Sequence, residues 1–412
     1  MKILHFADAH IDMANYGKHD PESGLPFRVL DFLKSLDAIV DAAISEKVDM
    51  VIFAGDAYKD RSPAPTFQRE WGRRIMRLSQ AKIPTLLLIG NHDVSPSIGR
   101  AHALQEFDTL QVPYVRVLSK IQLLKPNDLW GIPIQVIALP WISRSAFMTG
   151  DDFSSDKLDK LFNEMEDSIT DRIQELINET DKSLPLILTA HLSVLGAKYG
   201  GERMVMLGSD MVVTGSLVRN TNFDYVALGH IHKAQNLNEG FQPPVIYPGS
   251  IERVDFGEEK DDKFFVIAEI EKGNTNIAWR KLENIRPFIT KYITLESSEN
   301  ITQRLISSLP SPKKIKNSIV RLIIKYPREF DTHIDDNALF QHTKEAFEFH
   351  LVKHPQTDNK VRIPGEQVVS SLSPLDLLDQ YWKIIHAENR NIDVDALQKL
   401  AQEIISDENV DK

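Results

Sequence analysis

The sequence contains no cysteine among its 412 residues. Disulfide bonds, thiolate nucleophiles and cysteine-bound zinc or iron–sulfur sites are therefore excluded together. Any metal ion would have to be bound by histidine, aspartate, glutamate or asparagine. The chemistry open to this chain is thus that of carboxylate, imidazole and amide groups.

Long hydrophobic runs are also missing. No apolar stretch approaches the roughly 18 residues that a membrane-spanning helix needs. The first ten residues, MKILHFADAH, lack the long apolar segment of a secretory signal peptide. The phosphate-binding motif G-x-x-x-x-G-K-[ST] does not occur either. We therefore expect a cytoplasmic protein that has no membrane association and no ATP site of its own.

Charged residues are present at an ordinary 26%, but their signs are unevenly distributed along the chain. The net charge of −11 argues against a uniformly basic surface for nucleic acid. Residues 1–285 carry 31 basic and 40 acidic side chains, residues 286–365 carry 13 and 9, and residues 366–412 carry 4 and 10. A basic middle block and an acidic tail predict separate units with different partners.

The first 285 residues alternate short apolar runs with longer amphipathic stretches, which predicts an α/β domain whose helices flank mixed β-sheets. Two runs on either side of a turn at 272–274 predict a closing antiparallel hairpin. The predicted helices lie near residues 28–47, 65–81 and 154–180. The predicted strands are residues 2–7, 49–54, 85–89, 134–139, 185–190, 223–228, 245–247, 263–270 and 275–282.

A domain boundary is predicted at Arg286-Pro287, where the charge balance changes and proline disfavours continuation of the preceding element. Residues 286–365 predict a small α+β domain, in which the strands KYITL and SIVRLIIKYP alternate with helices, the second of them around residues 336–353. Residues 366–412 predict two amphipathic helices, and Ser373-Pro374 supplies the start signal of the first.

Residues of metal-ligand type follow five of the predicted strands. Because the ends of parallel strands can converge at one edge of a sheet, we expect these side chains to lie together. Carboxylates with several neutral imidazoles suit a pair of divalent cations such as Mn, Fe or Zn better than hydrated Mg. The residues are Asp8 with His10, Asp56, the turn Gly90-Asn91-His92-Asp93, His191, and His230 with His232.

Each of these elements alone also has an ordinary structural interpretation. Asp8-Ala9-His10 and Gly90 to Asp93 are rich in turn formers, and Asp56 after a glycine is common turn chemistry. His191 alone would be a hydrogen-bonded buried histidine. The occurrence of all five elements in order, each directly after an apolar strand, favours the metal interpretation.

The order D-x-H, G-D, G-N-H-D, H and G-H-x-H resembles the signature of calcineurin-like metallophosphoesterases over residues 1–285. The resemblance implies a sandwich of mixed sheets with flanking helices. Within that superfamily, YPGSIERVDFGE at 247–258 and the following DDKFFVIAEI resemble the SbcD-type DNA repair nucleases, bacterial counterparts of the archaeal and eukaryotic double-strand-break nucleases. This implies that residues 286–365 form a capping domain that contacts DNA, followed by partner-binding helices in 366–412.

The resemblance also implies a set of ligands for two divalent cations, which we expect to be Mn²⁺. His92 is left without a metal and would act on the phosphate, while Asp93 would hold the His92 ring in its tautomer and orientation. A turn-forming role is the alternative for Asp93. One metal is assigned to Asp8, His10, Asp56 and His232, and the other to Asp56, Asn91, His191 and His230, so that Asp56 bridges the two.

One position departs from the nuclease pattern. Many relatives have a histidine three residues after the bridging aspartate, where this chain has Lys59. That histidine is associated with exonuclease action, so the balance between exonuclease and endonuclease activity stays open. We expect Lys59, Arg61, Arg69 and Arg73 to contact DNA phosphates, and the alternative for the last two is an ordinary solvated helix face.

The function that these observations favour is a metal-dependent DNA nuclease, the subunit of an ATPase-coupled complex that processes double-strand breaks. The resemblance implies an SMC-like ABC ATPase of the SbcC type as partner, and pairing of two nuclease domains in a homodimer. One alternative is a phosphodiesterase or phosphatase for small molecules or nucleotides, which the additional residues after 285 disfavour. The other is a metal-free scaffold, which the intact ligand positions disfavour.

Overall fold

The computed structural model describes residues 1–16, 18–95, 101–142, 155–200 and 212–356, together with 378, 381–382 and 397–401. The chain divides into two compact units. The larger unit consists of Met1–Lys291, Pro310–Leu322 and Phe340–His350, and the smaller of Tyr292–Leu309, Ile323–Leu339 and Leu351–Lys412. The three-domain division expected from the sequence stays a prediction.

The first of two six-stranded sheets in the larger unit has the order β14-β13-β1-β2-β3-β4. Neighbours from β1 to β4 pair in parallel, whereas β13 pairs antiparallel with both β1 and β14. The closing hairpin is therefore confirmed, while the sequence did not indicate β4. The strands are β1 (Lys2–Phe6), β2 (Met50–Phe53), β3 (Thr85–Leu88), β4 (Val115–Leu118), β13 (Phe264–Glu271) and β14 (Asn274–Lys281).

The second sheet has the order β11-β12-β10-β7-β6-β5. Its central strands β12, β10, β7 and β6 are parallel, and the edge strands β11 and β5 are antiparallel to their neighbours. This sheet is mixed, like the first. Its strands are β5 (Gln122–Leu124), β6 (Gln135–Leu139), β7 (Leu186–His191), β10 (Tyr225–Gly229), β11 (Gln235–Asn236) and β12 (Val245–Tyr247).

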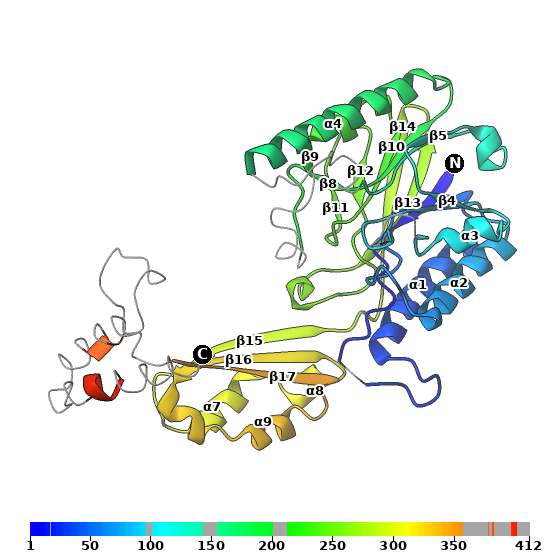
Figure 1. The fold of residues 1–412 in the computed structure, drawn as a ribbon. Helices are drawn as coiled ribbons and strands as arrows, with labels where there is room; N and C mark the ends of the chain where they lie inside the picture. The colour runs from blue at the N-terminus through cyan, green and yellow to red at the C-terminus, as the bar shows by residue number, and fades with distance from the viewer. Residues whose placement is uncertain are drawn as a thin grey trace, which may run out of the picture. The chain divides into compact units, whose positions relative to one another are not determined.

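The two sheets pack face to face and helices cover their outer faces, which confirms the expected sandwich. Alternation along β1 shows the layers: Ile3 packs between the sheets, and Leu4 packs in the core beneath the helices of the first sheet. Figure 1 shows α4 along one side of the larger unit and α1 and α2 along the other. The long helices are α1 (Phe27–Ser45), α2 (Pro65–Gln80) and α4 (Ser155–Asn178), close to the predicted ranges.

Shorter elements complete the larger unit between the main strands. A two-stranded sheet pairs β8 with β9 in parallel. The short elements are α3 (Gln105–Thr109), η1 (Pro126–Leu129), β8 (Ser193–Val194), β9 (Val212–Val213), α6 (Gly215–Val218) and η3 (Phe256–Glu258).

A three-stranded sheet of order β15-β16-β17 lies beyond residue 286. The prediction of a helix over 336–353 is wrong in its second half, because α9 ends at His342 and β17 begins at Glu348. The segment FEFHLV alternates phenylalanine with polar residues before it continues with Leu351 and Val352, in the manner of a strand, and its Phe349 is buried. The elements are β15 (Phe288–Thr294), α7 (Ile301–Ser308), α8 (Pro312–Ile315), β16 (Ile319–Pro327), η4 (Arg328–His333), α9 (Asp336–His342) and β17 (Glu348–Gln356).

Most of the predicted C-terminal segment, residues 366–412, lies outside the described residues. The positions described there, 378, 381–382 and 397–401, are helical. Among the helices that the structure describes, none is both long and apolar enough to cross a membrane.

Candidate metal centre

The loops after five parallel strands meet at one edge of the sandwich. In the first sheet, Asp8 and His10 follow β1, Asp56 follows β2, and Asn91 follows β3. The second sheet contributes the adjacent parallel strands β7 and β10. The sequence-predicted convergence is thus what the fold produces, because neighbouring parallel strands end on the same side.

The second sheet supplies three imidazoles. His191 is the last residue of β7, and its neighbour in register is Gly229, the last residue of β10. His230 and His232 follow directly in the loop. The contribution of the two sheets is therefore asymmetric, with carboxylates and an amide mainly from the first and imidazoles mainly from the second.

Four of these residues have left-handed backbone conformations. The φ angles are 50° at Asp8, 39° at His10, 64° at Asp56 and 99° at His230. L residues rarely adopt positive φ, and each such residue stores of order 1 kcal/mol of strain that the surrounding structure must offset. Concentration of this strain at four converging side chains is typical of a functional site.

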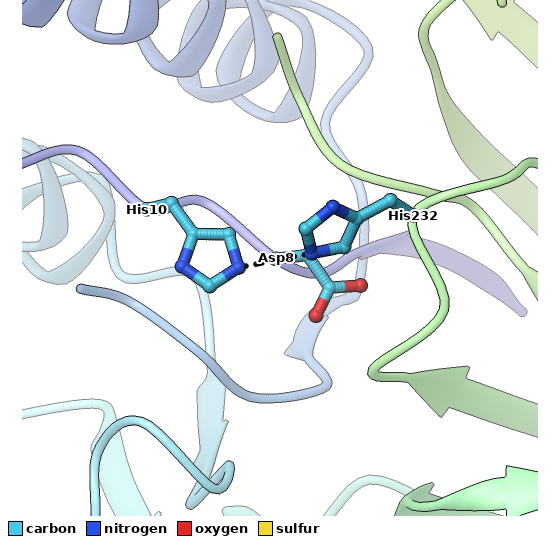
Figure 2. Close-up of side chains that lie close together, drawn as sticks. All are labelled: Asp8, His10 and His232. Carbon is cyan, nitrogen blue, oxygen red and sulfur yellow. Dashed lines mark hydrogen bonds between the residues drawn. The ribbon is translucent and has the colours of Figure 1, made fainter. Parts of the chain in front are cut away.

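Asp8, His10 and His232 form the first cluster, in which one potential ligand atom from each residue lies within 4.8 Å of the others. Figure 2 shows the two rings on opposite segments with the Asp8 carboxylate beside them. The Nε2 atoms of His10 and His232 are 3.1 Å apart. The backbone N–H of His230 donates to both Asp8 oxygens, at 2.9 and 3.1 Å, and so fixes the carboxylate.

The second cluster consists of Asp56, His191 and His230, again within 4.8 Å. Asn91 joins it, since its Oδ1 lies 2.9 Å from Nε2 of His191 and 2.9 Å from Nδ1 of His230. Oδ2 of Asp56 lies 3.3 Å from Nε2 of His191 and 3.9 Å from Nε2 of His10 in the first cluster. The Asp56 carboxylate therefore stands between the two clusters, where a bridging ligand would be.

The donor set of the first cluster fits a cation. Nδ1 of His10 donates to the carbonyl oxygen of Tyr58 at 3.2 Å, and Nδ1 of His232 donates to Oε1 of Glu258 at 2.8 Å. In the neutral rings the lone pairs are then on the two Nε2 atoms, which face each other. Two facing acceptors repel unless a positive charge lies between them, so this is the arrangement of two imidazole ligands to one ion.

The position of the imidazole lone pair leads to the same conclusion for the second cluster. Nδ1 of His191 donates to the carbonyl oxygen of Ala54 at 2.7 Å, so its Nε2 faces the oxygens of Asn91 and Asp56 with a lone pair in the neutral ring. A proton or a metal ion on Nε2 would satisfy all of these acceptors. The residues present thus fit two divalent cations, one for each cluster.

Burial and neighbouring charges set the protonation of these groups. Burial holds the pKa of His10 well below its ordinary value, and the adjacent His232 lowers it further. Burial opposes charge on His191 too, but the Asp56 carboxylate raises the pKa of His191 to about 9. Burial would raise the pKa of Asp56, yet the His191 ring lowers it below its usual range. An ionised Asp56 and a neutral His10 are the forms that bind metal ions.

Two glycines are required by close approach at the centre. A Cβ atom on Gly55, which also has a φ of 99°, would collide with the ring of His191. A Cβ on Gly90 would collide with the Asp56 carboxylate. These contacts explain why glycine precedes Asp56 and Asn91 in the sequence.

His92 lies at the rim, and its expected support by Asp93 is not the arrangement found. Nδ1 of His92 lies 2.6 Å from the carbonyl oxygen of Lys59, which therefore orients the ring. The buried Asp93 carboxylate instead accepts from the backbone N–H groups of Asp56, Ala57 and Gly90, at 2.8, 3.0 and 2.9 Å. Three amide donors in two turns compete better for this carboxylate than one imidazole, so Asp93 holds the loops that carry the ligands.

The basic residues predicted to contact DNA fall into two groups. Lys59 and Arg61 lie in the exposed loop after Asp56. Arg69 and Arg73, on α2, each pair with Oε1 of Glu70, at 2.9 and 3.0 Å. Lys59 and Arg61 therefore follow the candidate ligand Asp56 within five residues of the chain. Arg69 and Arg73 instead have an acidic partner, Glu70.

Two residues near the centre were not among the predicted site residues, although the sequence favours a core or pocket-wall position for Trp141. Trp141 has its ring centroid 5.1 Å from that of His230 and forms a wall of the second cluster. Glu258 contacts His232 directly. Glu258 belongs to the segment SIERVDFGE, which the sequence analysis singled out. Glu258 lies 26 residues after His232, and the sequence alone does not reveal that the two side chains are in contact.

Comparison with known proteins agrees with this geometry. The family model of calcineurin-like phosphoesterases matches residues 1–234. The chain belongs to the calcineurin-like phosphoesterase family.

The proteins to which the chain is similar include two that are named as nuclease subunits. The chain is 26% identical over 316 residues to the SbcD component of the nuclease SbcCD of Escherichia coli, covering 71% of this chain and 69% of the relative. It is 27% identical over 274 residues to the protein of the same name from Staphylococcus epidermidis, covering 66% of each. Among solved structures, TT1561 of Thermus thermophilus is similar with a TM-score of 0.40 and 15% identity, covering 68% of this chain and 98% of that one.

Proposed function

We propose that this chain cleaves DNA phosphodiester bonds as the nuclease subunit of an ATPase-coupled complex that processes double-strand breaks. The observation that carries the proposal is the pair of clusters on either side of Asp56. Asp8, His10, Asp56 and His232 would hold one Mn²⁺ ion. The other would be held by Asp56, Asn91, His191 and His230.

When bound, such a pair of cations supplies Lewis-acid activation of water and of the phosphodiester. The protein's own part is to hold the ligands and to manage a proton. Because Nδ1 of His92 contacts the Lys59 carbonyl oxygen, its Nε2 is the ring nitrogen available to the substrate. We assign it the transfer of a proton to the leaving oxygen, or the stabilisation of the charge that develops there.

Three observations support DNA as the substrate. The similar proteins of Escherichia coli and Staphylococcus epidermidis are both named as nuclease subunits. Lys59 and Arg61 are exposed on the loop next to Asp56, where they can contact a phosphate. Residues 286–365 carry 13 basic side chains against 9 acidic ones, in contrast to the acidic remainder of the chain.

The proposed partner is an SMC-like ABC ATPase of the SbcC type. The relatives are named as subunits of a complex. This sequence contains no P-loop motif, so ATP hydrolysis would require another chain. Within this proposal residues 366–412 bind the ATPase and the nuclease domain forms a homodimer.

The test compares cleavage of hairpin, linear duplex and circular single-stranded DNA in Mn²⁺, in Mg²⁺ and after chelation. We expect cleavage with Mn²⁺ and none after chelation. His92→Ala should retain both metal ions and lose about 10²- to 10⁴-fold in cleavage rate, the usual contribution of a positioned acid or base. Asp56→Ala should lose metal and activity together.

His19→Ala, at an exposed histidine outside residues 286–365 and outside the two clusters, is the matched control and should cleave at the parent rate. A His92→Ala protein that also cleaves at the parent rate would remove the role assigned to His92. A protein that hydrolyses bis-p-nitrophenyl phosphate or nucleotides but no form of DNA would instead be a small-molecule phosphoesterase.

A further inference from the structure

The segment that follows β12 returns to the metal centre and ends in a buried carboxylate. Glu258, the last residue of η3, has its Oε1 2.8 Å from Nδ1 of His232. Glu258 and Lys263 are each 1% exposed. A carboxylate in this position determines which nitrogen of His232 carries the proton.

The second carboxylate oxygen of Glu258, Oε2, accepts three hydrogen bonds. Oε2 of Glu258 accepts from Nζ of Lys263 at 2.6 Å, from Oγ of Ser250 at 3.2 Å and from the backbone N–H of Val254 at 3.1 Å. These three hydrogen bonds hold Oε2 in place, and Oε1 therefore stays directed at His232. The carboxylate therefore has little freedom to rotate.

Lys263 is equally well satisfied, although it is buried. Its ammonium group donates to Glu258, to Oγ of Ser250 at 2.6 Å and to the backbone carbonyl oxygen of His232 at 3.4 Å. A buried ion pair is tolerated only when such hydrogen bonds satisfy the remaining donors and acceptors. Lys263 thus contacts both the Glu258 carboxylate and the backbone of His232.

The support of His232 differs in kind from that of two other imidazoles at the centre. Nδ1 of His10 and Nδ1 of His191 donate to backbone carbonyl oxygens, of Tyr58 and Ala54. His232 donates to a charged group. A carboxylate partner makes an imidazole more basic and holds its orientation, which strengthens its bond to a metal ion.

We infer that Glu258 and Lys263 are positioning residues for His232, and that together they raise the affinity of the first cluster for its divalent cation. The inference rests on the metal role proposed above for His232. Glu258 fixes the ring rotation and the tautomer, so that Nε2 faces His10 and Asp8. Lys263 keeps Glu258 charged and in place. The second cluster has its own supports, among them the Ala54 carbonyl oxygen on His191, and should be unaffected.

The experiment titrates the metal-free protein with Mn²⁺ in a calorimeter and measures bound Mn²⁺ per chain, independently of cleavage. Glu258→Gln keeps the size and the acceptor but removes the charge. We expect one of the two sites to weaken by about 10- to 100-fold, the usual effect of losing such a partner, while the other is unchanged. Absorption of bound Co²⁺ should change in the same site only.

Glu252→Gln is the matched control, because Glu252 is also 1% exposed in the same segment and its Oε1 accepts from the backbone N–H of Arg253. It should bind both ions like the parent. The double variant Glu258→Gln with Lys263→Met guards against misfolding, since it leaves no unpaired buried ammonium. It should fold and still show one weakened site.

If Glu258→Gln binds Mn²⁺ at both sites with the parent affinity, the inference is overturned. It is also overturned if the single variant is weakened but the double variant has the parent affinity, because the defect would then come from an unpaired Lys263. Equal weakening of both sites would show a general structural effect and overturn it too. A parent protein that binds no Mn²⁺ would contradict the proposed function itself, so the two failures are distinguishable.

Discussion

Glu252 predicts a measurable dependence of stability on pH. This carboxyl group is almost fully buried beside the metal-binding segment. Burial raises the pKa of Glu252 to about 7 from an ordinary value of 4.5, although Arg28 opposes the shift. The folded protein thus binds this proton more tightly than the unfolded chain does. Stability is therefore lost as the pH rises from 4.5 to 7, and the loss is constant above that window.

The magnitude follows from the width of the window. A shift of one pKa unit corresponds to about 1.36 kcal/mol, so the elevated pKa of Glu252 costs about 3 kcal/mol of unfolding free energy at pH 8. Glu252→Gln is neutral at every pH and can still accept from the backbone N–H of Arg253. The variant should match the parent near pH 4.5 and exceed it by about 3 kcal/mol at pH 8.

The assay is urea unfolding of the metal-free proteins, followed by tryptophan fluorescence at several pH values between about 4.5 and 8. Glu283→Gln, at an exposed position of the same unit, serves as the control for removing one carboxylate charge from the chain. A stability difference between Glu252→Gln and the parent that is flat across this range, or that shrinks as the pH rises, would refute the reasoning.

Two further predictions concern residues on the loops that carry the metal ligands. Asp93→Asn puts an NH₂ group against backbone donors that the carboxylate now satisfies, so we expect a loss of about 1 to 3 kcal/mol for each orphaned N–H. The loss should appear in urea unfolding of metal-free protein, and an unchanged midpoint would contradict the anchoring role. Lys59→His should shift the ratio of exonuclease to endonuclease products toward exonuclease, with Lys59→Gln as control. An unchanged product ratio would exclude this position as its determinant.

The sequence predicted the parts of the centre that depend on strand ends. Asp8, Asp56 and His191 each follow a short apolar run, and parallel pairing of these runs places their ends at one edge. This inference needs only the strand period and the direction of the chain. The ligand residues could therefore be brought together before any contact was known.

Contacts between distant loops could not be predicted in the same way. Glu258 reaches His232 only because the loop after β12 folds back, and no periodicity encodes that return. Asp93 was expected to hold His92, its chain neighbour, but its oxygens accept from amides in two different turns. Proximity in the sequence did not predict the hydrogen-bond partner of the Asp93 carboxylate, because backbone N–H groups compete with the His92 ring for its oxygens.

The arginines of α2 show why charge counting along a sequence does not locate a surface that binds DNA. Arg69 and Arg73 share the Glu70 carboxylate, and Arg74 pairs with both Glu70 and Asp37. Each shared carboxylate offsets positive potential that a phosphate would otherwise experience. In the loop after Asp56, by contrast, the side chains of Lys59 and Arg61 form no ion pair with other described residues. DNA contact stays a prediction for all four residues, and a phosphate would compete with a carboxylate for the α2 arginines but with no such ion pair for Lys59 and Arg61.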